Sequence, residues 1–94
     1  MTTNPDRMTR LCRSLPLLAD RPGFGRGWDP ALVWPDAADD GVLPTWARSS
    51  SAAQQAVLFV RHVWNAHNPA PSMAFWDARH RAAFAEWASA PWWC

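Results

Sequence analysis

The stretch SSSAAQQAVLFVRHVWNAH, residues 49–67, carries the clearest helical pattern in the chain. Ser51 and Gln54 have the spacing of a capping box, which predicts a helix from about residue 52 to residue 66. Apolar side chains at helical spacing form a broad face that is expected to be buried: Ala53, Ala56, Val57, Val60, Val63 and Trp64. The other face is expected to be polar, with Leu58 in its middle: Gln54, Gln55, Arg61, His62 and Asn65. The pattern therefore predicts that one face of this helix packs in the core and that one large apolar side chain, Leu58, lies on the opposite face.

A second helix is predicted near the N-terminus. Asn4 is a good N-cap, Pro5 suits the first helical position, and the helix is expected to end near Ser14. Its apolar stripe is Met8, Leu11, Cys12 and Leu15, and its opposite face carries Arg7, Arg10 and Arg13. Asp6 is placed to pair with Arg10 one turn further on.

The last helix is predicted within residues 73–89, starting either at Ser72 or at Asp77, because both residues are suitable caps. Its stripe is Met73, Trp76, His80, Phe84 and Trp87. Pro91 ends it and leaves the tail WWC, residues 92–94, outside.

The region between the first two helices is irregular, since all four glycines and six of the nine prolines precede residue 49. DPALVW, residues 29–34, favours a short helical turn capped by Asp29. The expected fold is all-α: one domain over residues 1–94, with about three helices and a long, Pro/Gly-rich ordered loop packed across them. Residues 1–48 would supply a short helix and the loop, and residues 49–94 a helical hairpin.

Composition excludes several classes. A hydrophobic content of 49% and a net charge of +1 fit neither a disordered acidic tail nor a basic nucleic-acid arm. Nine arginines and no lysine, isoleucine or tyrosine indicate GC-rich coding, typical of a high-GC bacterium or its phages. No targeting or membrane-spanning segment is recognisable, which favours the cytoplasm and reduced thiols at Cys12 and Cys94.

Catalysis and metal binding find little support. The chain has no nucleophile elbow, P-loop or zinc-protease motif, Glu86 is the only glutamate, and Cys12 is expected to be a buried, inert thiol. Possible metal ligands are His62, His67, Asp77 and His80. The favoured interpretation is a surface His62, a loop His67 and an interior His80 bonded to a backbone carbonyl or to Asp77. We therefore expect that the chain is not an enzyme and that it binds neither a cofactor nor a metal ion.

The eight tryptophans point instead to binding, because tryptophan is enriched at interface hot spots. Neighbouring side chains on an extended tail point in opposite directions, so one of Trp92 and Trp93 is expected to anchor the tail while the other stays exposed. The leading hypothesis is a small protein-binding module that inhibits or adapts a larger protein or complex, and an anti-defence protein of a phage or mobile element would be one example. The predicted binding surface is Leu58, Arg61, His62, Trp92 and Trp93.

Two rival hypotheses remain. The loop could fold over the polar helical face and bury Leu58 under Trp28 or Trp34, leaving no site there. Alternatively, the chain could be a nucleic-acid-binding accessory protein that uses its Gly-Arg loop and a basic face made of Arg7, Arg10, Arg13 and Arg26. The near-neutral charge makes this the weaker hypothesis, because phosphate binding normally requires a larger positive excess.

Overall fold

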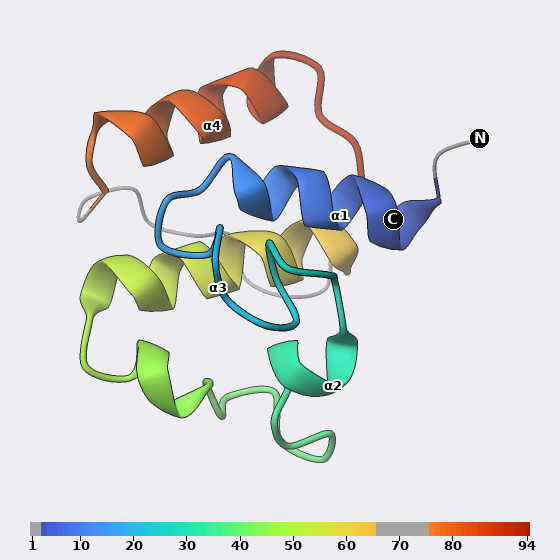
Figure 1. Cartoon of the computed structure of the whole chain (residues 1–94), viewed down its shortest axis with the longest axis vertical. Coiled ribbons are helices and arrows are strands. Elements are labelled where there is room, and N and C mark those ends of the chain that lie inside the picture. The colour runs from blue at the N-terminus through green and yellow to red at the C-terminus, as the bar shows by residue number, and fades with distance from the viewer. Residues whose placement is uncertain (1–2, 66–75) are drawn as a thin grey trace.

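The computed structural model describes residues 3–65 and 76–94, and these form a helical protein (Figure 1). In chain order the elements are α1 (Asn4–Arg13), α2 (Pro30–Val33), a 3-10 helix (Thr45–Ala47), α3 (Ser51–Trp64) and α4 (Ala78–Ser89). This part of the chain contains no β-strand, and its one isolated β-bridge joins Gly23 and Trp28. The all-α class predicted from the sequence is therefore confirmed for the described residues. None of their helices has the length and apolar character needed to cross a lipid bilayer.

The two long helices of the first two-thirds of the chain begin at the residues expected as their caps, so each starts one residue earlier than predicted. The Thr3 hydroxyl accepts from the Asp6 N–H at 3.2 Å, so Thr3 caps α1 and Asn4 is its first residue. Ser50 likewise accepts from the Ala53 N–H at 3.2 Å and caps α3. Each cap residue has an extended backbone, which directs its oxygen at the free N–H groups of the first turn.

The start of α4 decides between the two alternatives. Asp77 has an extended backbone and accepts from the His80 N–H at 3.0 Å, so it is the N-cap, and a helix continuous from Ser72 is wrong. Ser72 and Met73 themselves lie outside the described residues. The expected cap of α2 is confirmed, since Asp29 accepts from the Ala31 N–H at 3.0 Å.

The core lies where α1, α3 and α4 meet. In the view of Figure 1, α4 runs above α1 and α3 runs below it. The whole predicted stripe of α1 is buried. Phe59 joins α3 to α4, because its ring packs against those of Trp76, Phe84 and Trp87 at centroid distances of 5.8, 5.2 and 5.4 Å. Phe59 was absent from the predicted buried face, so α3 is covered over a wider arc than its apolar pattern indicated.

The glycine-rich stretch after α1 is built into this packing. Phe24 is fully buried and makes an edge contact with Trp46 at 5.4 Å. A side chain at Gly25 would collide with the backbone of Ala19, and Gly23 has a positive φ of 85°. These glycines therefore permit a close backbone approach and a tight turn.

Candidate functional site

The tail after α4 is fixed to the molecule by two hydrogen bonds. The Cys94 N–H donates to the Val63 carbonyl at 3.0 Å, and the Trp87 Nε1–H donates to the Trp92 carbonyl at 2.9 Å. Val63 lies in the last turn of α3, where carbonyls lack a partner within the helix, so the tail satisfies one of them. The tail is therefore part of the packed structure.

The adjacent tryptophans of the tail have different environments. Trp92 is half-buried against the core, and the Arg7 guanidinium lies 4.1 Å from the centroid of its ring. Trp93 is 46% exposed and meets Trp87 and His62 edge to face, at centroid distances of 5.3 and 6.3 Å. Trp92 is thus the anchor, and Trp93 is the large apolar side chain that reaches solvent.

Arg61 does not lie on a solvent-facing surface, so its assignment to the binding surface is wrong. Its side chain is fully buried. The guanidinium donates to three backbone carbonyls, those of Asp40, Val33 and Val42, at 2.7, 2.7 and 2.8 Å. Burial lowers the pKa of Arg61, and the nearby Asp40 charge opposes that shift.

The loop covers α3 as the rival hypothesis proposed, but the residue that it buries is Arg61. The Trp34 ring lies 5.3 Å from the Arg61 guanidinium carbon, and its edge meets Trp28 at 6.3 Å. Leu58 remains half-buried. The arginine side chain is long and its guanidinium carries several N–H donors, so it can bond several loop carbonyls at once. These bonds hold the loop over Arg61.

Leu58, His62 and Trp93 make up the exposed part of the predicted binding surface. Leu58 and His62 are four residues apart in α3 and so share one side of the helix. Both are half-buried, and the His62 ring packs against Trp93 and, at 6.3 Å, against Trp87. We call these three residues the Trp93 surface.

The four arginines of the nucleic-acid hypothesis do not form one face. The Arg13 guanidinium is directed at the glycine-rich loop, where its Nε–H donates to the Gly25 carbonyl at 2.9 Å. Arg7 and Arg10 line a groove instead, and Arg26 is exposed on the glycine-rich loop. The expected Asp6–Arg10 ion pair is not formed within the described residues.

The groove lies between α1 and α4 and has a volume of about 380 Å³. Arg7, Arg10 and Leu11 line it from α1, Glu86 and Trp87 from α4, and Trp92 from the tail. Sequence reasoning missed this site. The arginines were visible, but nothing in the sequence indicated that α4 and a tail tryptophan would face them.

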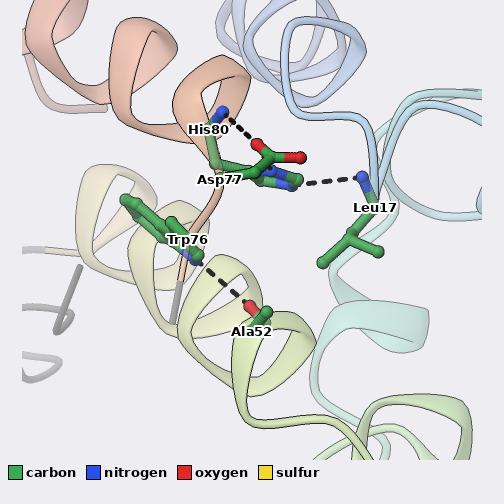
Figure 2. A network of polar contacts seen from close by, with 5 residues as sticks. All are labelled: Leu17, Ala52, Trp76, Asp77 and His80. Carbon is green, nitrogen blue, oxygen red and sulfur yellow. Dashed lines mark hydrogen bonds and ion pairs between the residues drawn. The ribbon is translucent and has the colours of Figure 1, made fainter. Parts of the chain in front are cut away.

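His80 takes part in a structural network at the first turn of α4 (Figure 2). Its Nδ1 lies 2.8 Å from the Asp77 carboxylate, and its Nε2 accepts from the Leu17 N–H at 3.2 Å. The neighbouring Trp76 donates from Nε1 to the Ala52 carbonyl at 3.1 Å. The expected interior His80 bonded to Asp77 is confirmed. The pKa of Asp77 is lowered, first by the hydrogen bond from the His80 N–H and then by the one from its ring.

The other candidate chemical groups are dispersed. Cys12 is fully buried in α1, as predicted, and burial raises the pKa of its thiol. His67 lies outside the described residues. Among the residues that the structure does describe, no three His, Cys, Asp or Glu side chains come close enough together to hold a metal ion.

Comparison with protein-family models, with curated proteins and with solved structures found no match to the chain.

Proposed function

We propose that the chain is a small, non-catalytic protein-binding module that inhibits or adapts a larger protein partner. The observation that carries this proposal is the Trp93 side chain, which is 46% exposed yet packed edge-on against His62 and Trp87. An exposed tryptophan held in one position loses little conformational entropy on binding, which favours a hot spot. Half-buried Leu58 adds apolar area on the same side of α3.

The biological setting is proposed from composition. The GC-rich residue usage is typical of a high-GC bacterium or of a phage that infects one, and an anti-defence inhibitor is one form that such a module takes. A net charge of +1 does not fit an inhibitor that imitates DNA with many carboxylates. Two unpaired thiols, Cys12 and Cys94, suit the reducing cytoplasm as its compartment.

The test is capture of partners from the native host with the wild-type chain and two variants. Trp93→Ala removes the exposed ring, whereas Leu17→Ala is a matched control that removes another exposed apolar side chain, 38% exposed and located near the other end of α4. We expect wild type and Leu17→Ala to capture the same protein, and Trp93→Ala to lose it while remaining folded at the temperature of the experiment, as its melting curve would show. Equal capture by Trp93→Ala would contradict the proposal.

The alternative of a nucleic-acid-binding accessory protein keeps one supporting observation. The guanidinium groups of Arg10 and Arg26 have no hydrogen bond or ion pair within the described residues. A salt titration separates the two functions, because phosphate contacts weaken steeply as salt rises, whereas an apolar protein interface changes little. We expect a shallow salt dependence for the captured partner and no measurable affinity for an oligonucleotide at physiological salt.

A further inference from the structure

The groove between α1 and α4 presents charges that the fold itself does not use. Within the described residues the Arg10 guanidinium has no hydrogen bond or ion pair, and the Arg7 guanidinium stacks on the Trp92 ring without a hydrogen bond or ion pair of its own. Each guanidinium therefore keeps its hydrogen-bond donors for water or for a ligand.

Arg7 is held in place before any ligand arrives. Its guanidinium carbon lies 4.1 Å from the Trp92 ring centroid, and the Trp92 carbonyl is in turn bonded by the Trp87 Nε1–H at 2.9 Å. A cation stacked on an indole retains its N–H donors at its edge, where they can meet an acceptor in the plane of the guanidinium. The stack therefore orients donors at the groove and lowers the entropic cost of binding.

The other residues of the groove favour a ligand with a single negative charge. Glu86 lines the groove from α4, so the two guanidinium groups exceed the carboxylates by one charge. A second anionic group, such as the next phosphate of a nucleic acid, would be repelled by Glu86. Leu11, Ala83 and Trp87 add apolar surface, which suits the carbon chain of an amino acid.

We propose that this groove binds one carboxylate side chain, Asp or Glu, from an apolar segment of the partner protein. Arg7 and Arg10 would donate charge-assisted hydrogen bonds to the carboxylate. A volume of about 380 Å³ accommodates one side chain and its immediate neighbours. The inference rests on the proposed function and adds a charged anchor beside the apolar one at Trp93.

The test uses the capped peptide acetyl-Ala-Leu-Glu-Leu-Ala-amide as the probe, with the same peptide carrying Gln in place of Glu as its match. Amide, indole and arginine Nε–H signals are followed by two-dimensional NMR during titration of the full chain. We expect the Glu peptide to shift the signals of Arg7, Arg10 and Trp92 in a saturable way, and the Gln peptide to bind about tenfold more weakly. Equal binding of the two peptides, or no shift at these residues, would overturn the inference.

Variants locate the site. Arg10→Gln is expected to weaken binding of the Glu peptide by about tenfold. Arg79→Gln is the matched control, because Arg79 is exposed on α4 and does not line the groove. Glu86→Gln is expected to tighten peptide binding and to admit inorganic phosphate and a single-stranded oligonucleotide. If an oligonucleotide bound the wild-type groove more tightly than the Glu peptide, the ligand of the groove would be a phosphate and not a carboxylate, and the proposal would be contradicted.

The two proposals fail in different experiments. If the Glu peptide binds through Arg10 but the chain captures no protein partner, the carboxylate site in the groove is supported and the proposed function is contradicted. If Trp93→Ala abolishes partner capture while Arg10→Gln changes neither capture nor peptide binding, the proposed function is supported and the carboxylate site in the groove is contradicted.

Discussion

The His80 Nε2 atom accepts a hydrogen bond from the Leu17 N–H at 3.2 Å, which joins the first turn of α4 to the segment after α1 (Figure 2). An acceptor nitrogen carries no proton, so the neutral ring must hold its hydrogen on Nδ1, facing the Asp77 carboxylate at 2.8 Å. We expect long-range proton–nitrogen NMR correlations to show that the neutral His80 ring is the Nδ1–H tautomer. A spectrum of the Nε2–H tautomer would show that the bond to Leu17 is absent.

Asp77→Asn is expected to destabilise the fold in a pH-dependent way. The folded pKa of Asp77 is depressed by its bonds from His80, so its stabilisation is present above the unfolded pKa of about 4 and is lost as pH falls through the folded value. Chemical denaturation at a series of pH values should therefore show the largest deficit of Asp77→Asn near neutrality and a shrinking one in acid. Asp20→Asn serves as the control, because Asp20 is exposed and its side chain has no hydrogen bond from the described residues. A deficit that is constant with pH would contradict this account.

Arg61→Met is expected to lower the free energy of unfolding by about 3 kcal/mol, because three backbone carbonyls, one of them buried, lose their donors and methionine supplies none. The carbonyls concerned belong to Val33, Asp40 and Val42. Amide hydrogen exchange should also accelerate between residues 33 and 42, where the loop is tied down. Arg79→Met, at an exposed position, should leave both measurements unchanged. A fully stable Arg61→Met would mean that the loop holds without these bonds.

Leu58→Ala and Phe59→Ala form a matched pair of neighbours on α3. Phe59 is fully buried among aromatic rings, so its truncation should cost about 3–5 kcal/mol of unfolding free energy. Leu58 is half-buried, and we expect its truncation to cost roughly 1 kcal/mol while weakening partner binding. Equal losses for both variants in thermal unfolding would place Leu58 in the core and remove it from the Trp93 surface.

The two cysteines should differ in reactivity. Cys12 is fully buried and burial raises the pKa of its thiol, whereas Cys94 is exposed. A colorimetric disulfide reagent should modify one thiol per chain in the native protein, and Cys94→Ser should abolish that reaction. The second thiol should appear only in denaturant. Rapid native modification of Cys12 would show that α1 opens readily.

Apolar periodicity was sufficient to predict the long helices, and it failed where a charged side chain is buried. The stripe of α1 follows from local pattern, and so does Asp77 as one of two possible caps of the last helix, because both depend on residues within one or two turns. Arg61 looked exposed because a helical projection records polarity and not the carbonyls that a distant loop will present. Those carbonyls come from residues 19 to 28 positions earlier in the chain, so no local signal announces them.

The binding surface was predictable only in outline. Alternation along an extended tail indicated that one of Trp92 and Trp93 would be exposed. Which of the two is buried depends on Arg7, which stacks on the Trp92 ring although it lies 85 positions earlier in the chain. The groove depends on the same long-range approach of α1 and α4. Side-chain type could be read from the sequence, whereas the juxtaposition of elements could not.

The extended tail gives the two proposed binding regions a shared mechanical element. Trp92 lines the groove and Trp93 forms the apolar surface, and one peptide bond separates the two residues. A ligand that moves either ring also moves the backbone that places the other. We expect occupancy of one region to change the affinity at the other, and by thermodynamic linkage the factor would be the same in both directions. With a favourable coupling, a partner that supplies both an acidic side chain and an apolar pocket would bind more tightly than the separate affinities of its two halves predict.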